Sequence, residues 1–140
     1  MPDPTTTRGL WPALLTPIGK DQSVDTGRLL AHARRMLDAG SDGITLFGTT
    51  GEGPAFTVAE RQSQLEALIK GGVRPDQIVA AITAVALGDA IQLGRHAAQC
   101  GVHRQMLMPP FYYNQPRDEG VVQAMSQVIE GIGDPALGML

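Results

Sequence analysis

The first group of residues suited to chemistry is a glycine- and threonine-rich segment, 48–53, with the sequence GTTGEG. It directly follows an apolar run, which predicts a loop at the end of a buried strand. The glycines let backbone N–H groups approach an anion such as a carboxylate, and the hydroxyls of Thr49 and Thr50 can relay protons. The segment fits either a small-anion site or a polar turn in which Gly48 and Gly51 serve geometry alone.

The glycine motifs that bind nucleotides are absent from this segment. No Gly-Lys-Ser/Thr follows it, as a phosphate-binding loop requires, and the Gly-x-Gly-x-x-Gly order of a dinucleotide turn is missing. Glu52 either orients the threonines through a hydrogen bond or adds negative charge before the next helix. We expect the structural role.

The second group is aromatic. Phe111, Tyr112 and Tyr113 are half of the chain's six aromatic residues, and they follow another apolar run. A tyrosine can act as an acid or base, with an unperturbed pKa of about 10. Phe111 and Tyr112 fit a hydrophobic plug or an oligomer contact as well as they fit chemistry.

The histidines and the cysteine are weaker candidates for a functional site. His32 and His96 fall on predicted helices, and His103 precedes a strand at the opposite rim, so no metal-ligand cluster is expected. Cys100 is the only cysteine, which excludes an internal disulfide and fits a reducing compartment. At a helix end beside a glycine, it is expected to be a small buried hydrophobic residue.

The sequence holds two lysines, Lys20 and Lys70. Lys70 ends a predicted helix, where a cation suits the helix dipole. Lys20 lies in a predicted loop. Neither falls on a predicted strand that could face the interior of a barrel.

A repeated pattern of apolar run, loop and amphipathic helix must position these residues. Strands are predicted at 10–16, 44–47, 78–82, 106–108 and, as a beginning, 136–140. Strands that alternate with helices at this spacing indicate βαβ units and a parallel sheet. Two α/β architectures remain open, a small doubly wound sheet of five strands and half of an eight-fold barrel, and in both ligands bind at the carboxyl ends of the strands.

Capping signals mark the helices between these strands. Asp25 or Thr26 begins the first helix, the capping box 57–60 (TVAE) the second, and Asp89 the third. Glycines end them, at Gly40, at 71–72 and at 101. The apolar face predicted for the fourth helix consists of Val121, Val122, Met125, Val128 and Ile129.

Composition excludes several classes of protein. The chain has 140 residues, of which 43% are hydrophobic, and a net charge of −3. No run approaches the roughly 18 apolar residues of a membrane span, and no basic patch suits nucleic acid. Residues 1–4 (MPDP) lack the pattern of a secretion signal. We therefore expect a cytoplasmic protein with no membrane or nucleic-acid partner.

Two motifs together resemble one family. The segments 48–52 (GTTGE) and 110–116 (PFYYNQP), with an opening 11–17 (WPALLTP), are similar to the dihydrodipicolinate synthase and N-acetylneuraminate lyase family of aldolases that handle pyruvate and related 2-keto acids. The resemblance covers about residues 9–140. It implies a (β/α)8 TIM barrel, of which this chain would be the N-terminal half, with about four βα units and the start of strand five.

The resemblance also implies roles for residues. Thr49 matches a threonine of a proton relay, and Thr50 matches the residue that holds the keto-acid carboxylate, in the loop shaped by Gly48 and Gly51. Tyr113 matches a relay tyrosine that reaches into a neighbouring subunit, which implies a homo-oligomer. Family members form a Schiff base between a lysine and the 2-keto acid, without a metal or an organic cofactor.

The family's Schiff-base lysine would lie beyond Leu140. We therefore expect residues 1–140 to be a single partial barrel, truncated before the lysine strand, which lacks normal turnover alone and needs a partner for its unpaired strand edges. One alternative is a non-catalytic half-barrel that binds a keto acid or assembles with a partner subunit. Another is an open doubly wound sheet with a binding or regulatory role. No Asp pair follows the first strand, which disfavours the last.

Overall fold

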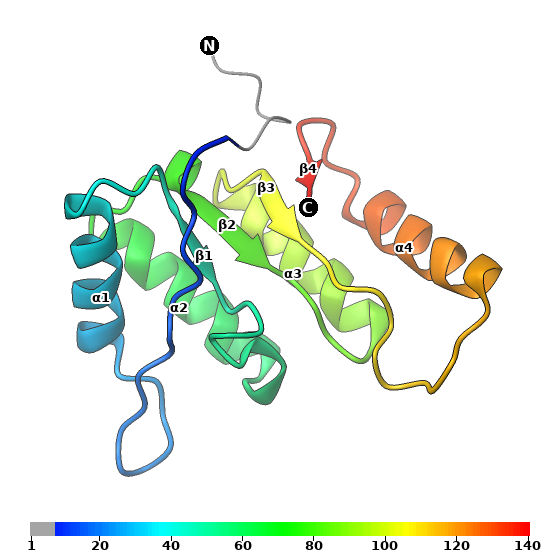
Figure 1. The fold of residues 1–140 in the computed structure, drawn as a ribbon, viewed down its shortest axis with the longest axis horizontal. Coiled ribbons are helices and arrows are strands. Elements are labelled where there is room, and N and C mark those ends of the chain that lie inside the picture. Colours follow the sequence, from blue (N-terminus) through cyan, green and yellow to red (C-terminus); the bar gives the residue numbers. More distant parts are fainter. Residues whose placement is uncertain (1–7) are drawn as a thin grey trace.

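The computed structural model describes residues 8–140, which alternate helices with short strands (Figure 1). The elements are α1 (Thr26–Asp38), β1 (Ile44–Leu46), the 3-10 turn η1 (Gly53–Ala55), α2 (Val58–Lys70), the 3-10 turn η2 (Pro75–Gln77), β2 (Ile78–Ala81), α3 (Leu87–Gln99), β3 (Arg104–Met106), α4 (Asp118–Ile132) and β4 (Gly138–Met139). The prediction that residues 1–4 carry no secretion signal lies outside the described residues.

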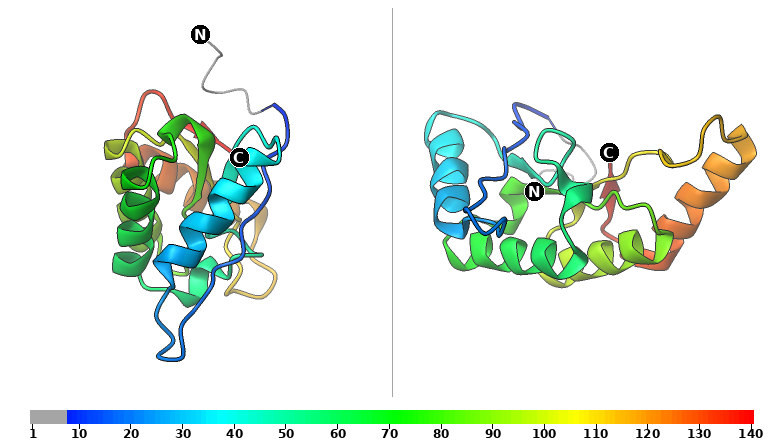
Figure 2. Two further views of the ribbon diagram at one scale, coloured as in Figure 1. Left: turned by 90° about the vertical axis from the view of Figure 1, so that its left-hand side faces the viewer. Right: turned by 90° about the horizontal axis from the view of Figure 1, so that it is seen from below.

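The four strands form one parallel sheet in the order β1-β2-β3-β4. Ile44 pairs with Ile78, Ala80 with Gln105, and Arg104 with Gly138. Within residues 8–140 the helices lie in an arc along one side of this sheet (Figure 2). A doubly wound sheet reverses its strand order and carries helices on both faces. The sequential order and one-sided helices are instead those of half of a (β/α)8 barrel.

The strand predicted at 10–16 is wrong in extent. This segment is extended and lies beside β1, where it forms a single parallel bridge between Ala13 and Thr45. The Leu14 N–H donates to the Thr45 carbonyl (2.9 Å), and the Thr45 N–H donates to the Pro12 carbonyl (2.9 Å). Pro12 and Pro17 have no N–H to donate, so a regular ladder cannot extend through the segment.

Helix starts follow the predicted caps in two cases out of three. The Asp25 carboxylate accepts from the Arg28 N–H (3.0 Å), and the capping box of Thr57 and Glu60 is complete. The prediction of Asp89 as the cap of α3 is wrong, because the N-cap is Ala86, three residues earlier, and the helix begins at Leu87. Asp89 lies in the first turn instead, where its charge suits the helix dipole.

The later strands are shifted or shorter than predicted. β3 occupies 104–106 rather than 106–108, since the Met108 N–H donates to the Thr83 hydroxyl (2.9 Å) and two prolines follow. β4 covers only two residues of the predicted 136–140. A turn in which the Asp134 carboxylate accepts from the Ala136 N–H (2.9 Å) occupies the start of that segment.

The core lies between the sheet and the helices in two clusters. One packs α1 and α2 on the sheet around Leu29, Ile44, Leu68 and Ile78, and the other packs α3 and α4 around the residues Ile82, Ala90, Leu93, Leu107, Val128 and Ile132. In the part of the chain described here, no helix has the length and apolar character to cross a membrane.

The apolar face predicted for α4 is partly wrong. Val128 is buried, and Val121 and Met125 are half-buried, but Val122 is 64% exposed and Ile129 40% exposed. The reason is that α4 is the last helix of the arc, so only its side toward α3 and the sheet is covered (Figure 2).

Candidate active-site rim

The carboxyl ends of the strands meet at one edge of the sheet, which we call the rim: segments 47–57, 82–86 and 107–117. The segment after β1 is a sharp, close-packed turn. Phe47 and Glu52 have left-handed backbones, with φ of 58° and 53°. A Cβ at Gly53 would lie 1.9 Å from the Phe47 carbonyl oxygen, and the Thr16 hydroxyl donates to the Gly51 carbonyl (2.7 Å). Glycines are therefore required for this turn.

The two threonines of this turn, Thr49 and Thr50, are exposed at the rim, while Gly48 and Gly51 are buried beneath them. The Thr49 hydroxyl donates to the sulfur of Met108 at 3.3 Å. Thr49 also lines a cavity of about 230 Å³. The residues around this cavity are Phe47, Gly48, Thr49, Pro54, Thr83, Met106, Met108 and Phe111.

Thr83 is a rim residue that sequence reasoning missed. It is buried, with 3% of its surface exposed, and its hydroxyl accepts from the Met108 N–H at 2.9 Å. Thr83 lines the same cavity as Thr49. The signal that could have found it is its position directly after the apolar run 78–82, where the carboxyl end of a strand was expected.

The aromatic residues lie on the segment between β3 and α4. Tyr112 and Tyr113 are 72% and 67% exposed, and their rings meet edge to face with centroids 5.6 Å apart. Both line a second cavity of about 400 Å³, mostly apolar, whose other walls come from α3, α4 and the segment after β2. Phe111 lines both cavities, so it lies between the space beside Thr49 and the space beside Tyr113.

The two lysines lie away from these cavities. Lys20 is exposed in the turn before α1, and Lys70 is exposed as the last residue of α2. Neither lines the cavity beside Thr49 or the one beside Tyr113.

The histidines on the later elements pair with carboxylates. Nε2 of His96 lies 2.7 Å from Glu66, and Sγ of Cys100 is 3.8 Å from the same nitrogen. Cys100 is half-buried rather than buried, and burial, with the charge of Glu66, raises the pKa of its thiol. Among residues 8–140, no three His, Cys, Asp or Glu side chains are grouped so that they could hold a metal ion.

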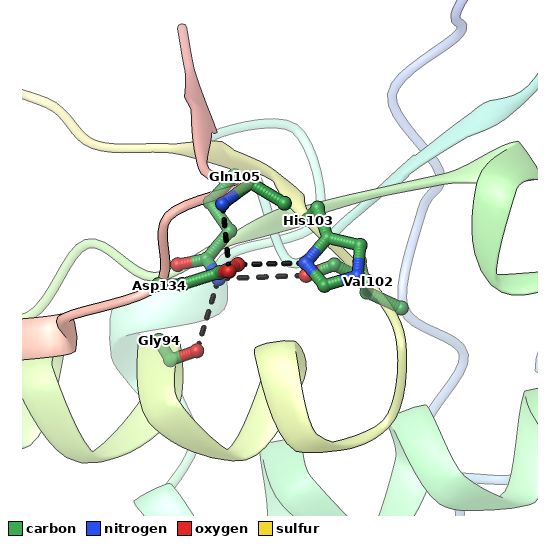
Figure 3. Close-up of polar contacts among 6 residues, drawn as sticks. Gly94, Val102, His103, Gln105 and Asp134 are labelled. Atoms are coloured by element: carbon green, nitrogen blue, oxygen red, sulfur yellow. Dashed lines mark hydrogen bonds and ion pairs between the residues drawn. The ribbon is translucent and has the colours of Figure 1, made fainter. Parts of the chain in front are cut away.

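At the amino ends of the strands, opposite the rim, Nδ1 of His103 lies 2.7 Å from the Asp134 carboxylate (Figure 3). Burial raises the pKa of Asp134, but hydrogen bonds from His103 and the Ala136 N–H, with the charge of His103, outweigh it and the net pKa is lowered. Beside this pair, the buried amide of Gln105 donates to the Gly94 carbonyl (2.9 Å). These contacts join β3, α3 and the turn before β4.

The parallel sheet in sequential order, with helices on one side, defines half of a (β/α)8 barrel. Enzymes with this barrel have their active sites at the carboxyl ends of the strands, where the hydroxyl groups of the rim lie. The model of the dihydrodipicolinate synthetase family matches residues 6–137. The chain belongs to that family.

Individual relatives agree with this assignment. A DapA-like lyase of Chloroflexus aurantiacus is 36% identical over 136 residues, which cover 95% of this chain and 44% of the relative. The crystal structure of dihydrodipicolinate synthase from Agrobacterium tumefaciens is 36% identical, covers 94% of this chain and 46% of that one, and has a TM-score of 0.87.

A Sulfolobus solfataricus 2-keto-3-deoxygluconate aldolase variant, solved as a pyruvate complex, shares the fold at 24% identity with a TM-score of 0.81, over 93% of this chain and 43% of its own. The chain thus spans less than half the length of the relatives that it matches.

Proposed function

We propose that this chain supplies the keto-acid-binding half of a lyase or synthase that forms or cleaves a C–C bond in pyruvate or a related 2-keto acid. The observation that carries the proposal is the close-packed glycine turn that presents Thr49 and Thr50 at the rim, with Thr49 beside a cavity that Thr83 also lines. Pyruvate carries one carboxylate and one carbonyl, which suit backbone N–H and hydroxyl donors.

Each rim residue has a place in this proposal. Thr50 and the turn formed by Gly48 and Gly51 hold the carboxylate. Thr49 relays a proton, with Tyr113 as the second relay group. The high exposure of Tyr113 supports a role at the site of a second copy in a homo-oligomer, since its ring is free to contact another chain.

The covalent step needs an amine. In this chemistry a neutral lysine nitrogen attacks the C2 carbonyl of the keto acid, a C=N bond forms and water leaves. Lys20 and Lys70 are both exposed and line neither cavity. We therefore propose that residues 1–140, a partial barrel, bind the keto acid without forming the adduct, and that the lysine comes from further sequence.

One observation favours the second candidate, a non-catalytic half-barrel that assembles with a partner. Among residues 8–140, β4 pairs with β3 on one side only, which leaves the N–H and C=O groups of its other edge available to another strand. A partner that continues the parallel sheet at this edge would satisfy them.

Calorimetry with pyruvate, followed by borohydride reduction and mass spectrometry, tests the function. We expect saturable binding that Thr50→Ala weakens at least tenfold and that Ser126→Ala, an exposed hydroxyl on α4, leaves unchanged. We expect no reduced adduct on either lysine. Absence of binding, or an adduct on Lys20, would overturn the proposal.

A further inference from the structure

Arg61 is a buried cation that the proposed mechanism does not use. It lies on α2 with 3% of its surface exposed, and its guanidinium donates to the Thr83 carbonyl (2.8 Å) and the Ala81 carbonyl (2.5 Å). Burial lowers its pKa to about 10, although the charge of Asp89 opposes the shift, so the side chain stays protonated at neutral pH. A buried charge is costly unless hydrogen bonds compensate it, and here both bonds go to the chain at the end of β2.

Arg61 also contacts the end of β1. Its Cζ atom lies 5.8 Å from the centroid of the Phe47 ring, within reach of a cation–π interaction. Phe47 is itself buried and has the left-handed backbone from which the glycine turn begins. One side chain therefore contacts the residue that follows β1 and the chain at the end of β2.

A third strand end is reached through Thr83. The backbone of Thr83 accepts from Arg61, while its hydroxyl accepts from the Met108 N–H. The sulfur of Met108 in turn accepts from the Thr49 hydroxyl. The contacts thus run from Arg61 through Thr83 and Met108 to Thr49.

We infer that Arg61 is a positioning residue, which holds the ends of β1 and β2 and, through Thr83, fixes Met108 and the hydroxyl of Thr49. That this arrangement serves keto-acid binding rests on the proposed function. The positioning itself does not, because it concerns contacts within the free protein.

Amide hydrogen exchange by NMR tests the positioning directly. The Met108 N–H donates to a side-chain hydroxyl, so its exchange rate reports whether Thr83 stays in place. The reference amide is that of Val102, which lies just before β3, away from the rim, and donates to the Ala97 carbonyl of α3 (2.9 Å). We expect Arg61→Met to accelerate exchange at Met108 at least tenfold relative to Val102. Arg95→Met is the matched control, since exposed Arg95 also donates to a backbone carbonyl, that of Gly131 (2.7 Å).

Thr83→Val keeps the test decisive if Arg61→Met does not fold. It removes the acceptor of the Met108 N–H, and the same selective acceleration is expected, with Arg61→Lys giving an intermediate rate. Equal acceleration at Met108 and Val102 in the Arg61 variants, or none at Met108 in Thr83→Val, would overturn the inference.

Pyruvate calorimetry on Arg61→Lys separates the positioning role from the role in keto-acid binding. A loss of affinity of at least threefold supports the link to binding, whereas a wild-type chain that binds no pyruvate contradicts the proposed function and leaves the exchange result to judge Arg61.

Discussion

The hydroxyl of Thr49 donates to the sulfur of Met108 across 3.3 Å, although 59 positions separate the two residues in the sequence. This contact joins the glycine turn after β1 to the aromatic segment after β3. A thioether sulfur is a weak acceptor, so a ligand oxygen can replace it at little cost. In the free protein this weak hydrogen bond orients the Thr49 hydroxyl at the rim, and little free energy is needed to turn the hydroxyl toward a ligand.

Met108→Leu should remove this acceptor with little effect on stability. The side chain is 40% exposed and the exchange conserves volume, so the free energy of unfolding should fall by less than about 1 kcal/mol. Urea denaturation measures this change. A loss of several kcal/mol would show that Met108 carries packing that the structure does not indicate.

Gly53→Ala should be among the most destabilising single changes in the chain. The added Cβ would lie 1.9 Å from the backbone oxygen of Phe47, which cannot move without the turn, so we expect a loss of more than about 4 kcal/mol. Gly120→Ala is the control, because a Cβ there meets nothing within 4 Å and alanine favours the helix by up to about 1 kcal/mol. Thermal unfolding compares the two, and similar melting temperatures would contradict the described turn.

The contact between His103 and Asp134 should make stability depend on pH in acid. Because the pKa of Asp134 is lowered in the folded state, its contribution is present above the unfolded value of about 3.9 and is lost as the pH falls through the folded value. The stability difference between wild type and Asp134→Asn should therefore shrink as the pH falls below about 5. Denaturant midpoints across this range measure it. Asp38→Asn, an exposed carboxylate, should keep the wild-type profile, and a difference that grows on acidification would be inconsistent with the contact.

Val128 and Val122 on α4 distinguish the buried face seen in the structure from the wider apolar face predicted from the sequence. Val128→Ala removes two methyl groups from a fully buried position and should cost about 2 kcal/mol, whereas Val122→Ala, at a site 64% exposed, should cost less than about 0.5 kcal/mol. Chemical denaturation of both variants tests this. Equal losses would mean that Val122 is covered in solution, as it would be at an interface.

Local signals in the sequence predicted much of this fold. The side chains of Asp25, Thr57 and Glu60 form their caps through hydrogen bonds within a few residues, so the sequence contains all that these caps need. The alternation of apolar runs and helices predicted the parallel sheet. The α4 face was only partly predictable, because its sequence is apolar on two sides and which side is covered depends on neighbouring elements.

The candidate site was harder to predict. The glycine turn could be predicted, since its residue types are required by a sharp bend. Arg61 could not, because a charged residue in a helix is ordinarily expected at the surface, and its burial is compensated by the carbonyls of Ala81 and Thr83, which come from another element. The link between Thr49 and Met108 depends on the spacing of two strands, which no local pattern contains.

The most direct test of the account is an NMR titration of this chain with pyruvate, followed at individual backbone amides. We predict saturable shifts concentrated at residues 48–51 and at Thr83, with Val102 and Asp134 at the opposite ends of the strands unaffected. Shifts centred on 102–105 or on the turn at Asp134, or no shifts at saturating pyruvate, would contradict the claim that the rim binds a keto acid.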